Sequence, residues 1–500
     1  MGIPGMFRAI VKAHPAIICM RNQVGPVARC YVDFNAQIHP LCAAHLQLVK
    51  SEGRDADETV MIQDVIKHTR NLIQIARPAD RTYLATDGVP PLAKMQQQRR
   101  RRFISALVST NAKSSAWDRN AISPGTAFMA ALSAAIKSDV KNEPIELWDD
   151  AEHGEGEAKI FQHLREAPTD DAVIINGLDA DLICLALVSP VRRIFLMREP
   201  VNFSMPSNEA FLYLDIDALR KGIENQGVDV RSYVAMCMLL GNDFLPALGP
   251  LRIKRGGIDV LTRALSRCAA PLVTAEGALD TAVLHLLLRE IEPLETKQML
   301  ELHRWYQNAS PPPTTKQDVM WEYFPILAQN KEVIDVFGRG DWRDNYRRLL
   351  FPGRQTPQEA AECYMEGLRW NVSYYMDGYR TIDASRWHYP YPYGPLADDL
   401  AKVAAATPKP AARYVAPKGT TEPFSPHECL LLILPPQSGG LLPTWARPIM
   451  ADPLRGCTHI YPTKFGFHSY LRQFMHEATP RLPPFDTECV LRQTRPQKKL

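Results

Sequence analysis

Short apolar runs alternate with helical stretches through the first half of the chain, and this alternation leaves few folds open. The apolar runs are rich in Val, Ile, Leu and Tyr, and they read "RCYVDF", "TYLATD", "DDAVIINGLDAD", "RRIFLMRE" and "FLYLDI". Helical patterns such as "TVMIQDVIKHTRNLIQIA" and "GTAFMAALSAAIKSDV" separate them. Alternation of this kind is typical of an α/β domain, so we expect a largely parallel sheet flanked by helices.

Acidic residues recur where these strands are expected to end. One follows "CYV", one follows "TYLAT", two follow "AVIING", one follows "YVAMCMLLGN", and two lie in "HGEGEAKIF". The seven residues are Asp33, Asp87, Glu155, Glu157, Asp179, Asp181 and Asp243. In open α/β sheets the carboxyl ends of the strands line one crevice, so these five segments could direct their carboxylates to one place.

Such a group of carboxylates predicts a metal site. Like charges held close together raise one another's pKa values, and a hard divalent cation removes the conflict. Carboxylates and water suit Mg²⁺ or Mn²⁺, and two such ions about 3.5–4 Å apart are the usual arrangement for phosphodiester hydrolysis. Taken singly, each acid is better explained as a turn former or a helix cap. The hypothesis therefore depends on their joint occurrence.

A basic run follows the second of these acids. Lys94 to Arg102 reads "KMQQQRRRR", and Pro90 and Pro91 could begin a helix there. Four of its side chains would share one side of that helix: Lys94, Gln98, Arg101 and Arg102. Guanidinium forks suit phosphate oxygens, and the alternative is a solvated basic face. The nearby acids favour a phosphate pocket.

Bulk properties set further limits. The net charge of the 500 residues is only +3, so any footprint for nucleic acid must be local. The ten cysteines are scattered without a CxxC pair, which predicts reduced thiols, no zinc site and no disulfides. No run of eighteen apolar residues occurs, so we expect no membrane span. We expect a cytoplasmic monomer, with a nuclear location left open.

Longer motifs carry a resemblance to a known family. "MGIPGMFR", "YVDFNAQIH", "DGVPPLAKMQQQRRRRF", "SPGTAFM", "GEGEAKI", "GLDADLICLAL" and "LLGNDFLP" stand in the order seen in the XRN family of 5′→3′ exoribonucleases. "EGLRWNVSYYMDGY", "RWHYPYPYGPLADDL", "PFSPHECLLLILPP", "IMADP" and "IYPT" resemble that family's second conserved region. The likeness runs from Met1 to about Pro484.

The resemblance implies a PIN/FEN-like nuclease domain with a mostly parallel central sheet flanked by helices, plus a largely helical second region packed against it. We expect the nuclease domain at residues 1–265, a helical connecting region at 266–345, and the second region at 346–500, with extended segments and a basic tail. The implied activity is processive hydrolysis of single-stranded RNA from a 5′-monophosphate end, with release of mononucleotides and two Mg²⁺ or Mn²⁺ ions.

The resemblance also assigns roles. The seven acids would hold the metals and carry out catalysis, and Lys94, Gln98, Arg101 and Arg102 would bind the 5′-phosphate. His39 would stack on the terminal bases with a tryptophan, either Trp370 or Trp387. Ala158 departs from the family, in which "GEGE" is commonly followed by His. Two alternatives stay open at this point: a flap-type, structure-specific DNA nuclease, and a catalytically silent RNA-binding scaffold.

Overall fold

The computed structural model describes residues 3, 5–111, 117–200, 210–310, 332–351, 356–382, 385–414, 422–472 and 474–495. Residues 311–331 of the expected connecting region and residues 496–500 of the expected basic tail lie outside the described residues.

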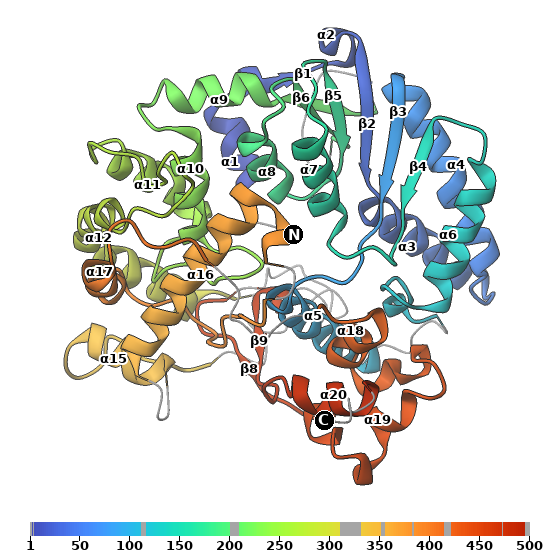
Figure 1. Cartoon of the computed structure of the whole chain (residues 1–500). Coiled ribbons are helices and arrows are strands. Elements are labelled where there is room, and N and C mark those ends of the chain that lie inside the picture. The colour runs from blue at the N-terminus through green and yellow to red at the C-terminus, as the bar shows by residue number, and fades with distance from the viewer. Residues whose placement is uncertain are drawn as a thin grey trace, which may run out of the picture.

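A seven-stranded, mostly parallel sheet forms the centre of the first half, in the order β1-β7-β6-β5-β2-β3-β4 (Figure 1). Five neighbouring strands are parallel: β2 (Val27–Asp33), β3 (Pro78–Ala85), β4 (Ile145–Trp148), β5 (Val173–Asn176) and β6 (Ile194–Arg198). β7 (Leu212–Asp215) and β1 (Ile18–Cys19) continue one edge in antiparallel fashion. The expected α/β class is confirmed. Strand β4 was not expected, because "IELW" is too short to show a pattern.

Helices cover both faces of the sheet because successive strand residues point to opposite sides. In β2, Cys30 and Val32 join one apolar core, while Tyr31 joins the other. The first core lies under α3 (Asn35–Glu52), α4 (Glu58–Ala76) and α6 (Ala127–Asp139). The second lies under α1 (Met6–Ala13), α7 (Gly156–Glu166), α8 (Asp181–Val188) and α9 (Ile216–Glu224). The short α2 (Arg21–Val24) precedes β2.

The basic run is helical, as expected. Helix α5 (Leu92–Asn111) begins directly after Pro90 and Pro91, and it lies below the sheet in Figure 1. The segment before Asp243 corrects the sequence analysis, which placed a strand end there. It forms α10 (Val230–Cys237) and a following 3₁₀ turn. The Asp229 side chain caps α10 by accepting a hydrogen bond from Ser232 N at 2.9 Å, and the Ala, Met and Leu content favours a helix.

The second half is largely helical and packs against the first, as expected. It contains α11 (Gly257–Leu265), α12 (Thr281–Asn308), α15 (Trp342–Leu350), α16 (Pro357–Asp377) and α17 (Ala397–Ala406). It continues with α18 (Pro426–Ile433), α19 (Arg447–Ala451), the small pair β8 (Phe467–His468) and β9 (Thr479–Pro480), and α20 (Thr487–Thr494). Helix α16 contacts α8 and α10, while α18 contacts α5. No helix in the described ranges is long and apolar enough to cross a bilayer.

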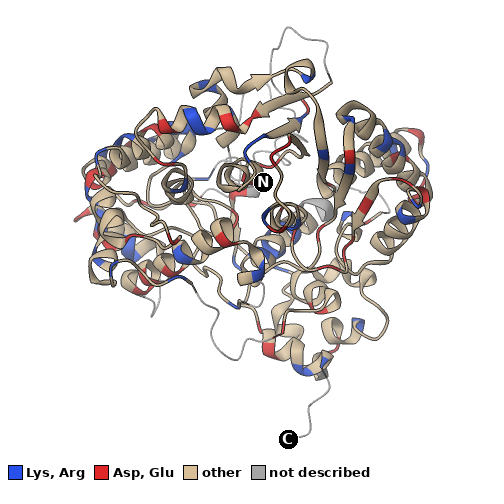
Figure 2. Ribbon diagram, turned by 45° about the horizontal axis from the view of Figure 1, so that its top comes forward, with Lys and Arg blue, Asp and Glu red and all other residues tan. Residues whose placement is uncertain are grey.

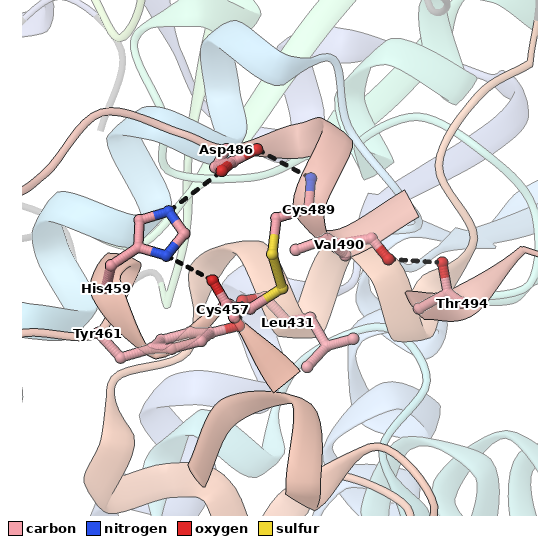
Figure 3. The surroundings of a disulfide bond; sticks show 9 residues. Leu431, Cys457, His459, Tyr461, Asp486, Cys489, Val490 and Thr494 are labelled. Carbon is pink, nitrogen blue, oxygen red and sulfur yellow. Dashed lines mark hydrogen bonds and ion pairs between the residues drawn. A yellow bond between two sulfur atoms is a disulfide. The ribbon is translucent and has the colours of Figure 1, made fainter. Parts of the chain in front are cut away.

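One pair of cysteines departs from the expectation of reduced thiols. Cys457 and Cys489 form a disulfide with their Cα atoms 5.9 Å apart, while the other eight cysteines are free (Figure 3). Beside the bond, His459 Nε2 lies 3.1 Å from Asp486 Oδ2. The two cysteines are 32 residues apart, so no local spacing signals the pairing.

Candidate active site

Three acids form the centre of the site. Asp33 ends β2, Asp87 follows β3, and Glu157 lies in the first turn of α7. One carboxylate oxygen from each lies within 4.8 Å of the other two. Opposite ligands of an octahedral Mg²⁺ ion are about 4.2 Å apart, so a small contraction would bring these oxygens around one ion. The neighbouring parallel strands explain why Asp33 and Asp87 meet at the same edge of the sheet.

Backbone and amide donors hold Asp87 in place. Asn35 Nδ2 donates to Asp87 Oδ2 at 2.9 Å, and Asp87 N donates to Asn35 Oδ1 at 3.1 Å. Gly156 N donates to Asp87 Oδ1 at 2.9 Å. A Cβ atom at Gly156 would lie 2.6 Å from Ala85 O and 3.2 Å from Asp33 Oδ1, so a side chain there would collide with a strand end. The glycine between the two glutamates of "GEGE" is thus explained by close packing.

Lys94 joins two further acids. Its Nζ atom lies 2.8 Å from Asp243 Oδ2 and forms an ion pair with Glu155, and all three side chains are buried. Burial alone would lower the pKa of Lys94, but the charges of Asp243 and Glu155 raise it well above its usual value. Burial alone would raise the pKa of Asp243, and Lys94 outweighs it, so that pKa is lowered. Glu155 Oε2 is buried without a hydrogen-bond partner, so an oxygen acceptor is left for a cation.

The remaining acids complete the group. Tyr375 OH, from α16, donates to Asp181 Oδ1 at 3.0 Å. Burial, and then the charge of Asp243, raises the pKa of Asp181 to about 7. The charge of Asp179 also raises the pKa of Asp181 and that of Asp33, so Asp179 belongs to the same electrostatic neighbourhood. The structure therefore brings all seven acids together, while their chemical roles stay predictions.

The electrostatics of the group are those of a cation site. Burial, followed by the charges of neighbouring carboxylates, raises the pKa values of Asp33 and Glu157 well above their usual range. Burial raises the pKa of Glu155 to about 7 even with Lys94 beside it. Such carboxylates take up either protons or metal ions. The donor set is all oxygen, which suits Mg²⁺ or Mn²⁺.

The other three residues of the basic face follow Lys94 along α5. Gln98 Oε1 is buried without a hydrogen-bond partner. Arg101 is exposed, and Arg102 donates to Ser123 Oγ at 2.6 Å. Burial lowers the pKa of Arg102 to about 10, at which it keeps its charge at neutral pH. Figure 2 shows acidic and basic residues beside each other near the middle of the molecule. The acids and the basic helix are therefore neighbours, with Lys94 as their link.

His39 lies on α3 beside these arginines. Its imidazole is exposed to solvent yet sits within a dense surround of protein atoms, and this desolvation lowers its pKa to about 4. Asp87 opposes the shift, and the charges of Arg101 and Arg102 add to it. His39 is thus a neutral ring with a free surface at neutral pH, as a stacking group requires.

The two candidate tryptophans occupy the core. Trp370 is 0% exposed, stacks on Tyr374 with ring centroids 5.6 Å apart, and meets Phe244 edge-on at 4.7 Å. Trp387 is 8% exposed and lies 5.3 Å from Trp370. Neither ring has a face open to a base in this structure. The expected stacking partner of His39 is therefore not supplied by either residue here, because both fill the interior beside α16.

Three positioning residues escaped the sequence analysis. Asn35 and Tyr375 hold Asp87 and Asp181, as described above. Lys159 is buried, and its Nζ donates to Thr86 O at 2.9 Å and to Asp149 O at 2.7 Å, tying together the ends of β3 and β4. Burial lowers the pKa of Lys159 to about 8. Asn35 had a weak signal, since it stands two residues after Asp33, but the other two contacts depend on tertiary structure.

Comparisons with known proteins match most of the chain to one family. Residues 1–200 match the family model described as the XRN 5′-3′ exonuclease N-terminus, and residues 342–499 match the Xrn1 helical domain. The 5′-3′ exoribonuclease 2 of Debaryomyces hansenii is 23% identical over 706 residues, which cover 98% of this chain and 69% of that protein. The 5′-3′ exoribonuclease 1 of Homo sapiens is 24% identical over 594 residues, which cover 98% of this chain and 34% of that protein.

Among solved structures, the chain is similar to the bacteriophage T5 D15 protein co-crystallised with metal ions. The two are 11% identical, the match covers 55% of this chain and 88% of the phage protein, and the TM-score is 0.31. The fold class is defined by the strand order of this chain itself.

Proposed function

Because this chain belongs to the XRN family of 5′→3′ exonucleases, we propose that it is a 5′→3′ exoribonuclease acting as a monomer on single-stranded RNA. It removes mononucleotides processively from a 5′-monophosphate end. The proposal depends on the position of Lys94. This residue lies on the basic helix α5, and its ammonium group lies between Glu155 and Asp243 in the acid cluster. One residue thus joins the group that would bind the strand end to the group that would cut it.

The seven acids are proposed to hold two Mg²⁺ or Mn²⁺ ions. When bound, these ions would activate water and neutralise the charge that develops on the leaving oxygen. The protein orients their ligands: Asn35 and Gly156 N fix Asp87, and Tyr375 fixes Asp181. No side chain is needed as a general base, so His39 is left for binding.

The face of α5 is proposed to bind the terminal phosphate. Arg101 and Arg102 supply guanidinium forks and Gln98 supplies an amide. Lys94 supplies an ammonium group at the end of this face nearest the acids. Fixing the terminal phosphate fixes which phosphodiester reaches the acids, so each cut removes one nucleotide. A compact pocket would exclude a triphosphate or a cap by size and charge. After product release, the next phosphate takes the same place.

His39 is proposed to stack on a terminal base. A stacked base contributes about 1–3 kcal/mol with little sequence preference, which suits an enzyme that degrades many RNAs. The neutral imidazole adds no charge to a site that already holds cations. A duplex would present no free base to this ring, so only a single strand would be bound productively.

The test compares one single-stranded RNA carrying a 5′-monophosphate, a 5′-triphosphate or a 5′-hydroxyl, with a flapped DNA of the same sequence. We expect rapid release of mononucleotides from the monophosphate RNA alone, and no release in EDTA. The double variant Arg101→Ala/Arg102→Ala should lose the end preference, while Arg54→Ala, at an exposed arginine paired with Glu52, should keep it. Equal rates on all three ends would refute the pocket, and preference for the flap would assign a DNA nuclease.

A further inference from the structure

A second group of arginines surrounds the segment at residues 389–395. Arg100, on α5, is linked to this segment by Gln96. With its amide oriented to satisfy both neighbours, the Gln96 oxygen accepts from Arg100 Nη2 at 2.8 Å and the Gln96 nitrogen donates to Tyr389 O at 3.2 Å. Arg472 Nη2 donates to Pro392 O at 3.3 Å. Two separate stretches of the chain therefore meet at this segment.

The third arginine approaches from the loop after α10. Gly249 N donates to Pro395 O at 3.0 Å, which docks the loop on the same segment, and Arg252 Nη1 donates to Gly249 O at 3.0 Å. Tyr346 OH donates to Gly394 O at 2.8 Å. The charges of Arg252 and Arg472 oppose the rise in the pKa of Tyr346 that burial causes, so both arginines lie near this hydroxyl. We call Arg100, Arg252 and Arg472 the arginine triad.

The positive charge of the triad is only partly balanced by neighbouring carboxylates. All three side chains are half-buried, and none forms an ion pair with a carboxylate of the described residues. The charge of Glu477 reaches Arg252, but that carboxylate also accepts from Phe474 N at 3.2 Å. Burial and then the charge of Arg472 lower the pKa values of Arg100 and Arg252 to about 10.

Few of the guanidinium donors have a protein acceptor among the described residues: Arg100 Nη2 donates to Gln96, Arg252 Nη1 donates to Gly249 O and Leu251 O, and Arg472 Nη2 donates to Pro392 O. Each guanidinium carries five N–H donors in a planar fork, and Arg472 directs one hydrogen bond to a protein acceptor and lies 5.8 Å over the Tyr393 ring. Clustered like charges are costly. A group with several anionic oxygens would relieve that cost and accept from the remaining donors, and arginine forks match phosphate.

We propose that the arginine triad binds a backbone phosphate of the RNA strand, at a nucleotide beyond the terminal one. This inference rests on the proposed function, because it takes RNA to be the substrate. Arg100 is six residues from Lys94, about 9 Å along the helix axis, and it projects from a different side of α5 than Lys94, Gln98, Arg101 and Arg102. The triad is thus a separate contact that holds the strand while its end is exchanged.

The experiment measures RNA binding in EDTA, where hydrolysis is stopped, by fluorescence anisotropy. The ligands are a 5′-phosphorylated dinucleotide and a 12-nucleotide RNA, and the variants are Arg472→Gln, Arg100→Gln and the charge-conserving Arg472→Lys. We expect the glutamine variants to bind the 12-mer roughly tenfold more weakly, with a salt slope smaller by about one, and to bind the dinucleotide as before. Arg472→Lys should fall between. Arg492→Gln, at an exposed arginine of α20, is the control and should bind as wild type.

Thermal unfolding separates binding from a structural role. Without RNA, Arg472→Gln should unfold at the wild-type temperature or above, because a repulsive charge is removed, and the 12-mer should stabilise it less than wild type. Titration with inorganic phosphate separates the sources of the anion. If phosphate stabilises wild type but not Arg472→Gln while 12-mer binding is unchanged, the triad takes a free anion and the RNA assignment is overturned.

Unchanged binding of both ligands in all variants would overturn the site itself. The proposed function fails differently: an RNA that is bound through the triad but never degraded with metal present would refute the exonuclease and leave the triad standing.

Discussion

Replacing Lys94 with methionine would remove the buried cation that Glu155 and Asp243 share. Methionine has a similar length and no charge, so the change isolates the electrostatic contribution. Lys94 and Asp243 are 7% and 6% exposed, and the ion pair between them spans 2.8 Å. Breaking such a buried pair leaves an uncompensated charge and costs about 3–5 kcal/mol. We expect a loss of that size in the free energy of unfolding at pH 8 in EDTA.

The loss should shrink as the pH falls. In wild type, Lys94 keeps the pKa of Asp243 low, so the stability that this aspartate contributes persists down to acidic pH. In Lys94→Met, burial would instead raise the pKa of Asp243, so this carboxylate would be protonated in the folded variant. The folded variant then loses stability as the pH rises above about 4, the pKa of aspartate in the unfolded chain. The difference between the two proteins should therefore widen from pH 5 to pH 8, and Mg²⁺ should narrow it.

Urea denaturation at pH 5, 6.5 and 8, with EDTA or with Mg²⁺, measures this difference. The matched control is Lys221→Met, since Lys221 pairs with Asp217 at the same 2.8 Å on the surface and should change stability little at any pH. A Lys94→Met protein as stable as wild type, with the same pH dependence, would refute the reasoning that Lys94 neutralises the acids.

Three other outcomes follow from the site. Tyr375→Phe should keep the fold but need more metal for half-maximal RNA cleavage, because Asp181 loses a hydrogen bond that contributes about 1.5–3 kcal/mol. An unchanged metal requirement would show that Tyr375 does not position Asp181 for the metal. Trp370→Ala should lower the free energy of unfolding by about 3–5 kcal/mol, since the ring is fully buried; weaker RNA binding at unchanged stability would instead indicate a stacking ring. Binding of Mn²⁺ measured by calorimetry should strengthen from pH 6 to pH 8, because Glu155 and Asp181, each with a pKa of about 7, must lose protons; equal affinity at both values would contradict this.

Local patterns predicted much of the fold and part of the site. The period of the strands, the turn after β3 and the proline pair before α5 are all written in short stretches of sequence, so the parallel sheet and the basic helix could be predicted. The convergence of Asp33 and Asp87 follows from one rule, that the carboxyl ends of parallel strands meet. Their joint placement with Glu157 in the structure agrees with that rule.

Other features depend on contacts between distant residues. The segment before Asp243 is apolar enough to pass for a buried strand, although its Ala, Met and Leu content favours the helix that forms. Trp370 has the size and chemistry of a stacking ring, but its burial depends on Tyr374 and Phe244. Lys94 was assigned to the phosphate, and only the fold shows that its ammonium lies between two carboxylates. The pairing of Cys457 with Cys489 likewise has no local signal.

The most direct test of the account is an anomalous-scattering map from a crystal of this protein soaked in Mn²⁺. The account predicts a peak between the carboxylates of Asp33, Asp87 and Glu157, with a second peak close enough to share ligands with it. Peaks confined to other surfaces, with these three carboxylates left without an ion at saturating Mn²⁺, would contradict the claim that the acids at the strand ends form a divalent-metal centre.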